Sequence, residues 1–126
     1  MSVEMVSPRV SGTLRVLFLG AMTSAWYEAS EDERRQRILP RFKGLMQEWQ
    51  DLGATTVATL DDDLLMVGQP VSTGYTFFLM FEVERLETAV EMIQRIREPV
   101  DGVRMDAYAR FEARVGRPFF LLEPPA

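Results

Sequence analysis

Four side chains of this sequence could together bind an anion and move a proton: Arg15, Tyr108, Arg110 and Glu112. Arginine stays charged and binds carboxylates or phenolates through a planar fork, so Arg110 would stabilise an anion and Arg15 would help to bind it. Glu112 or Tyr108 would move the proton. A cross-strand ladder of ion pairs holding a dimer together explains the same residues without any ligand.

An aromatic pair, Trp26 and Tyr27, is a second candidate, because it follows the first predicted strand on a predicted loop at residues 20–29. Such a pair could stack on a flat substrate, with Phe78 and Met80 forming part of a pocket wall. The alternative is a hydrophobic staple or lid over the helix that begins after Ser30.

Histidine and cysteine are both absent, and Lys43 is the single lysine. Thiol nucleophiles, imidazole bases, Ser-His-Asp triads and ordinary structural zinc sites are therefore excluded within this chain. Proton transfer would rest on carboxylates, tyrosines, the backbone or bound water. We expect no metal or organic cofactor.

The formal net charge of −5 and the lack of a basic stripe argue against nucleic-acid binding. No apolar run approaches the ~20 residues that span a bilayer, and we identify no signal peptide, so a cytoplasmic protein is expected. The triplet Asp61-Asp62-Asp63 lacks the spacing of a calcium loop and is predicted to be a solvated turn or the end of the preceding strand.

Apolar and polar residues alternate over residues 103–114, which predicts one long strand with two different faces. The same alternation predicts a first strand at residues 13–19. The other two strands are predicted at residues 54–60 and 75–83, which are rich in β-branched or aromatic side chains. Residues 64–67 could extend the strand at 54–60 as an edge segment.

Two helices are predicted between these strands. Ser30 and Glu33 fit a capping box, apolar residues recur at helical spacing up to Leu52, and Gly53 suits a C-terminal cap. Pro40 either kinks this helix or begins a second segment. A second amphipathic helix is predicted before Pro99.

The resulting order, βαββαβ, predicts an α+β ferredoxin-like fold with two helices on one face of a four-stranded antiparallel sheet. We expect a flexible arm at residues 1–12, a domain at 13–116 and a tail at 117–126. The bare apolar face of the sheet would associate with a second copy, which predicts a homodimer whose interface is sealed by residues 119–122.

Over residues 13–116 the sequence resembles the dimeric α/β-barrel superfamily. The resemblance rests on the element order, the Trp26-Tyr27 loop and the closing segment at 108–118. That superfamily includes antibiotic-biosynthesis monooxygenase-like and muconolactone-isomerase-like proteins. The resemblance implies a ligand pocket between the helices and the sheet or between two sheets. The absence of histidine argues against a heme role and against histidine-based mechanisms.

We therefore expect a small enzyme that acts without a cofactor on an aromatic or polyketide-like intermediate of secondary metabolism or aromatic catabolism. The reaction would be an oxygenation, an isomerisation or a cyclisation. The alternative is a non-catalytic ligand-binding or chaperone-like accessory protein of such a pathway.

Overall fold

A computed structural model describes residues 12–68 and 74–123, and the arm predicted at 1–12 lies, apart from Gly12, outside them. No helix in these ranges is long and apolar enough to cross a membrane. The elements are β1 (Leu14–Met22), α1 (Ser24–Glu28), α2 (Glu31–Glu33), the π-helical turn η1 (Arg34–Ile38), α3 (Leu39–Asp51), β2 (Thr55–Asp61), β3 (Phe77–Val83), α4 (Leu86–Arg97), α5 (Met105–Tyr108) and β4 (Ala109–Gly116).

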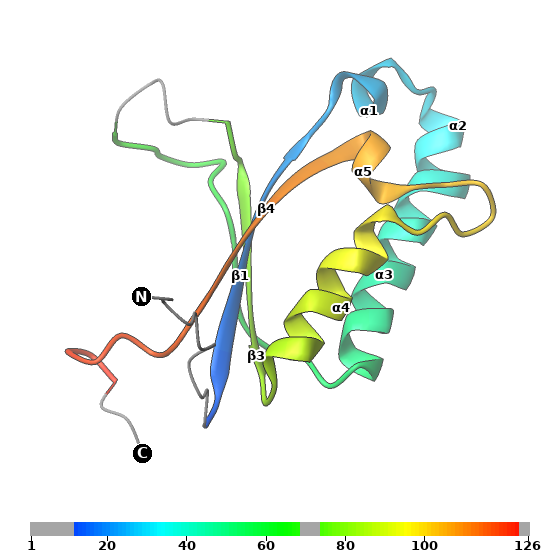
Figure 1. The fold of residues 1–126 in the computed structure, drawn as a ribbon. Coiled ribbons are helices and arrows are strands. Elements are labelled where there is room, and N and C mark those ends of the chain that lie inside the picture. The colour runs from blue at the N-terminus through cyan, green and yellow to red at the C-terminus, as the bar shows by residue number, and fades with distance from the viewer. Residues whose placement is uncertain (1–11, 69–73, 124–126) are drawn as a thin grey trace, which may run out of the picture.

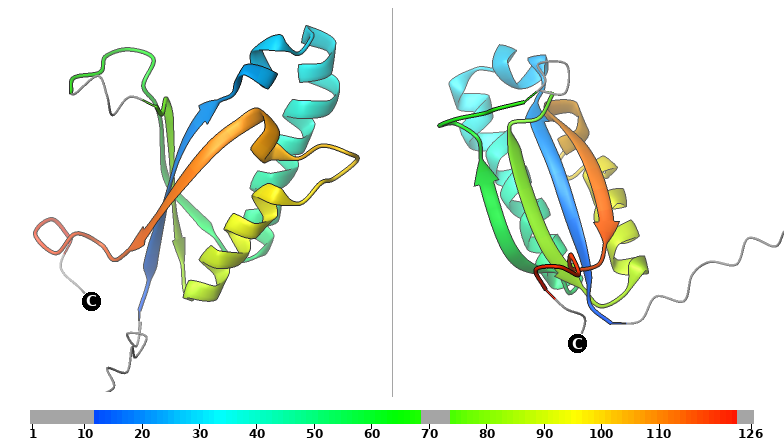
Figure 2. Two further views of the ribbon diagram at one scale, coloured as in Figure 1. Left: turned by 45° about the horizontal axis from the view of Figure 1, so that its top comes forward. Right: turned by 90° about the vertical axis from the view of Figure 1, so that its left-hand side faces the viewer.

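The strands form one antiparallel sheet in the order β2-β3-β1-β4. Helices α3 and α4 lie side by side on one face (Figure 1), and no described helix covers the other face (Figure 2). The predicted α+β fold with βαββαβ order is therefore confirmed, and its strand order is that of a ferredoxin-like sheet.

The core lies between the sheet and these two helices. Leu14, Val16 and Phe18 of β1 point into it, since alternate residues of a strand share a face. Phe18 stacks on Trp49 of α3 with ring centroids 4.4 Å apart. The indole Nε1 of Trp49 donates to the carbonyl oxygen of Met92 at 2.9 Å, so the helices are joined inside the core.

The first long helical segment begins and ends as the sequence predicts. The Ser30 hydroxyl accepts a hydrogen bond from the Glu33 amide at 3.1 Å, and Gly53 has a φ of 109° just after α3. Pro40 lies in the first turn of α3, directly after η1. Because proline cannot donate a backbone hydrogen bond, the wider π-helical turn before it accommodates Pro40 without breaking the segment.

The single strand predicted at 103–114 is wrong in its first part. The chain turns tightly at Asp101 and Gly102, both with positive φ, and then forms α5 before β4 begins at Ala109. Val103 and Met105 are buried because they pack under the helices, which alternating polarity alone cannot distinguish from a strand. From Ala109 onwards the predicted alternation of faces holds.

Two smaller expectations also differ. The loop predicted at residues 20–29 is the end of β1 followed by α1, and Trp26 and Tyr27 lie on that short helix. Residues 64–67 are not a strand but part of the long connection from β2 to β3, which projects from the sheet (Figure 1).

Candidate functional site

A cavity of about 520 Å³ opens between the helices and the β2 side of the sheet. Trp26 of α1, Phe42 of α3 and Phe77 of β3 supply three aromatic rings to its wall. The remaining apolar lining comprises Met22, Leu39, Leu60 and Leu79, and the polar lining comprises Thr59, Asp61 and Thr76. We call this the helix–sheet cavity.

Helix α1, which carries Trp26, is held to η1 by Arg34. The Arg34 Nε donates to the Trp26 carbonyl oxygen at 2.8 Å, and Nη2 donates to the Tyr27 carbonyl oxygen at 2.7 Å. The guanidinium carbon also lies 5.3 Å from the centre of the Trp26 ring. One planar fork therefore fixes both the end of α1 and the indole at the cavity.

The face of the sheet that lacks helices, here called the open face, is apolar at its centre. Leu17 pairs with Met80, and Leu19 pairs with Phe78. Leu60 of the edge strand pairs with Phe78 from the other side. Two hollows lie on this face, one of about 350 Å³ beside the β2–β3 connection and one of about 420 Å³ beside the C-terminal segment.

A polar cluster lies on the open face near the β2–β3 connection. The Arg110 guanidinium lies 5.0 Å from the Tyr75 ring centre and donates to the carbonyl oxygen of Gly74. Glu112 lies 3.6 Å from Arg114. A hydrogen bond with Glu112 raises the pKa of the Tyr75 phenol above its ordinary value, since it favours the protonated form.

A second polar cluster lies at the other end of the open face. Arg15 forms ion pairs with Glu82 at 3.2 Å and with Glu123. Contact with Arg15 lowers the pKa of the Glu123 carboxyl, and the same contact raises the pKa of Arg15. This cluster fixes the C-terminal segment to β1.

The structure separates residues that the sequence predicted to act together. Arg15 pairs with Gly116, whereas Arg110 pairs with Ala21, six residues further along β1 or about 20 Å away. Trp26 lines the helix–sheet cavity, on the opposite side of the sheet from Arg110 and Glu112, which lie on the open face.

The other predicted residues are distributed as follows. Tyr108 ends α5, where its carbonyl oxygen accepts from the Thr23 amide at 2.9 Å. Tyr27 is mostly exposed. Phe78 and Met80 line the two hollows of the open face rather than the helix–sheet cavity.

Sequence reasoning missed two residues, Tyr75 and Asp61. Tyr75 was assigned to an apolar strand, but it precedes β3 and contacts β4, a pairing that depends on sheet order. Asp61 was predicted to lie in a solvated turn or at the end of the second strand; it does end β2, but its place in the lining of the cavity was not predicted. Its position after a run of strand residues was the available signal.

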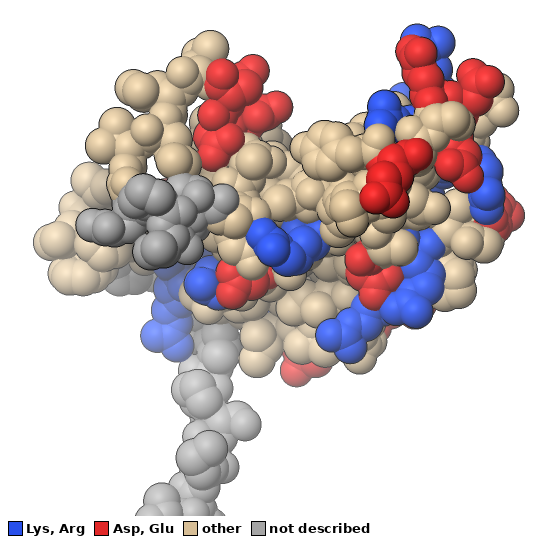
Figure 3. Space-filling model, turned by 90° about the horizontal axis from the view of Figure 1, so that it is seen from above, with Lys and Arg blue, Asp and Glu red and all other residues tan. Residues whose placement is uncertain are grey.

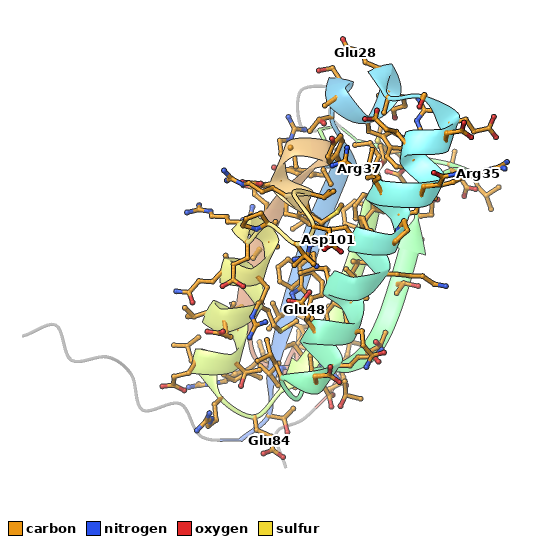
Figure 4. All side chains as sticks on the ribbon, turned by 90° about the vertical axis from the view of Figure 1, so that its right-hand side faces the viewer. Glu28, Arg35, Arg37, Glu48, Glu84 and Asp101 are labelled. Carbon is orange, nitrogen blue, oxygen red and sulfur yellow. The ribbon has the colours of Figure 1, made fainter. Side chains whose placement is uncertain are left out.

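A third concavity, of about 190 Å³, lies on the outer side of the helices (Figure 4) beside Arg37, Glu48 and Asp101. Its floor includes Arg41, which is only 4% exposed. Arg41 pairs with Glu48 at 2.6 Å and donates to the carbonyl oxygens of Arg95 and Glu98 at 3.3 Å each. These contacts join α3 to the end of α4.

The described residues include no group of three or more His, Cys, Asp or Glu side chains arranged to hold a metal ion. No protein-family model matches the sequence, and no curated protein matches it. The fold is similar to that of the crystal structure of RPA0582, a protein of unknown function from Rhodopseudomonas palustris, with a TM-score of 0.59 and 20% identity over 87% of this chain and 85% of that one.

The crystal structure of methylated RPA0582 protein is also similar, with a TM-score of 0.57 and 20% identity over 93% of this chain and 86% of that one. At this identity the likeness concerns the fold alone. What the chain does must be argued from its own cavities and surfaces.

Proposed function

We propose that this protein binds a flat, mainly apolar small molecule of aromatic or polyketide type in the helix–sheet cavity. The observation that carries the proposal is the cavity of about 520 Å³ with the rings of Trp26, Phe42 and Phe77 in its wall. This volume falls within the range of roughly 300–1,000 Å³ that is usual for ligand pockets, and such pockets are mostly lined by apolar and aromatic side chains.

The polar groups of the cavity suggest the substituent that such a ligand carries. Asp61 is the single ionisable side chain among its lining residues, and Thr59 and Thr76 are its neighbours there. A carboxylate accepts hydrogen bonds, and bonds to a charged acceptor are the stronger ones. The ligand therefore carries a hydroxyl or another donor group that reaches Asp61.

The working form, in this proposal, is a homodimer formed through the open face. Two neighbouring cross-strand pairs, Leu17 with Met80 and Leu19 with Phe78, form an apolar patch on this face. No described helix covers the patch. Apolar patches of this kind on a sheet face mark association sites, and a second copy related by a two-fold axis covers both faces at once.

An enzymatic role is the second candidate, and Asp61 is the observation that favours it. A carboxylate in an apolar wall can accept a proton from a hydroxylated or enolisable ligand, which is the first step of a cofactor-independent isomerisation, cyclisation or reaction with oxygen. Arg110 and Glu112 lie on the open face, across the sheet from this cavity, so they take no part in this step.

The binding proposal is tested with 1,3-dihydroxynaphthalene, a hydroxylated aromatic probe, by isothermal titration calorimetry. We expect saturable binding that is weakened about tenfold, or 1.4 kcal/mol, by Asp61→Asn. Asp63→Asn, an exposed neighbour outside the cavity lining, is the matched control and leaves the affinity unchanged. Trp26→Leu also weakens binding. Absence of saturable binding, or binding indifferent to both cavity variants, would refute the proposal.

The same probe separates catalysis from binding. Its ring C–H positions exchange with deuterium through the keto form, and exchange is followed by proton NMR. An enzyme accelerates this exchange, and Asp61→Asn abolishes the acceleration. Binding without acceleration supports the accessory role.

A further inference from the structure

Two apolar segments project from the open face at opposite ends of the sheet. The loop arm, residues 64–67, contains Leu64 at 94% exposure, and the tail arm, residues 119–122, contains Leu122 at 82% exposure. Both extend away from the helices (Figure 1). Every residue of both arms is apolar and more than half exposed. Four such side chains in a row exceed the scattered apolar exposure of an ordinary surface.

Each arm adjoins one of the two hollows of the open face. The loop arm lies beside the hollow of about 350 Å³, where Leu19, Leu60 and Phe78 take part in the lining. The tail arm adjoins the hollow of about 420 Å³, whose lining includes Leu17 and Met80. Each end of the open face therefore offers both an apolar projection and an apolar recess.

The two ends differ in charge. The loop end carries the triplet Asp61-Asp62-Asp63, and Figure 3 shows acidic side chains gathered beside the projecting β2–β3 connection. The tail end carries Arg114 and Arg117 in the lining of its hollow. Like charges placed together would repel, whereas the acidic end of one molecule is attracted to the basic end of another.

We infer that the open face binds a second copy of this chain with the two ends exchanged, an inference that rests on the proposed homodimer. The loop arm of one protomer lies over the partner's hollow of about 420 Å³, beside the partner's tail arm. The partner's tail arm in turn fills the hollow of about 350 Å³ beside the loop arm of the first protomer. A two-fold axis repeats this contact, so each protomer places one loop arm and one tail arm on its partner and receives the partner's two arms in return. Asp62 then faces the partner's Arg117.

The far end of the tail arm is held in position before association. Glu123 follows the arm directly and is bound by the Arg15 guanidinium, which also binds Glu82 of β3. Such an anchor reduces the entropy that the arm loses when it contacts a partner. Arg15 is thus assigned a role in dimer formation, as a positioning residue for the tail arm.

The inference is tested by sedimentation-equilibrium ultracentrifugation of the full chain. Asp62→Arg and Arg117→Asp are each expected to raise the dimer dissociation constant by at least tenfold. The double variant, in which both charges are exchanged, is expected to return within threefold of the wild type. Glu87→Arg, an exposed change on α4, is the control and leaves the constant unchanged.

Leu65→Ser and Phe120→Ser test the apolar arms and are each expected to weaken the dimer at least tenfold. Circular dichroism melting shows that each variant folds. If the double variant does not restore the wild-type dissociation constant, the exchange of ends is overturned. If neither Leu65→Ser nor Phe120→Ser changes the dissociation constant, the role of the arms is overturned. A wild-type monomer at all concentrations would overturn the proposed homodimer itself, while ligand binding in the helix–sheet cavity would stand.

Discussion

The ring of Phe77 lies directly over Gly20, its register partner on the neighbouring strand, and leaves no room for a Cβ atom at that position. Phe77 is also one of the three rings of the helix–sheet cavity. Glycine at position 20 therefore sets how deeply that ring lies and, through it, the shape of the cavity.

Replacing Gly20 with alanine is expected to displace the Phe77 ring. Overpacking of this kind costs about 1–3 kcal/mol, measured as a lower free energy of unfolding in urea. Because the displaced ring lies in the cavity wall, affinity for 1,3-dihydroxynaphthalene falls as well. Gly116→Ala is the control, since a Cβ there meets nothing within 4 Å, and it is expected to change stability by less than about 0.5 kcal/mol. Equal effects of the two variants would contradict this role of Gly20.

Arg34→Lys is expected to weaken ligand binding more than it weakens the fold. Lysine keeps the charge but loses the planar fork that reaches the carbonyl oxygens of Trp26 and Tyr27. The indole then moves more freely, and affinity for the naphthalene probe falls about threefold to tenfold by calorimetry. Arg35→Lys is the matched control, because Arg35 forms an exposed ion pair with Glu31 in the part of the chain that the structure describes and does not line the cavity. The idea fails if the two variants bind the probe alike.

Ionisation of Tyr75 is expected at a higher pH than that of an ordinary tyrosine, which has a pKa of about 10. A raised pKa favours the protonated phenol in the folded state, so its contribution to stability is present below the unfolded pKa and is lost as the pH rises through the folded pKa. Absorbance at 295 nm, compared between wild type and Tyr75→Phe, gives the midpoint for this residue.

Glu112→Gln should bring that Tyr75 midpoint down, because the hydrogen bond to the carboxylate is the main cause of the shift. Glu91→Gln, on the helical side of the molecule, is the control. A Tyr75 midpoint that is unaffected by Glu112→Gln would show that the two side chains do not interact in solution.

Arg41→Met is expected to lower the free energy of unfolding by about 1–3 kcal/mol, because it removes the buried partner of Glu48, which keeps its pair with Arg95 at 3.1 Å, and frees two carbonyl oxygens at the end of α4. Arg35→Met, which removes an exposed pair on the same helical segment, should cost no more than about 0.5 kcal/mol. Denaturant unfolding measures both, and similar losses would mean that burial of Arg41 contributes little.

The sequence predicted most of the helices and strands because their signals are local. Ser30 and Gly53 mark helix ends through their own hydrogen bonds and backbone angles, which involve only near neighbours in the chain. The same local reasoning failed at 103–114, where Met105 alternates with polar residues yet lies in a short helix. Met105 is buried because it packs against elements distant in the sequence, and the periodicity of polar and apolar residues does not indicate such packing.

The candidate site was predicted less completely. Trp26 does line a cavity, but Asp61 joins it only because the end of β2 lies beside α1 and α3 in space. Tyr75, just before β3, contacts Arg110 of β4 across the intervening strand β1. Tyr75 and Arg110 lie 35 positions apart, and Asp61 lies 35 positions from Trp26 and 19 from Phe42, so no local pattern could indicate either arrangement.

The sequence by itself determined the βαββαβ order, the helix caps, the two-faced last strand and the exclusion of histidine and cysteine chemistry, since these follow from residue types and their near neighbours. Only the tertiary structure decided that Trp26 and Arg110 lie on opposite faces of the sheet and that Arg15 and Arg110 lie at opposite ends of it. The physical reason is that strand order and register are set by long-range packing, which alone determines which distant side chains meet.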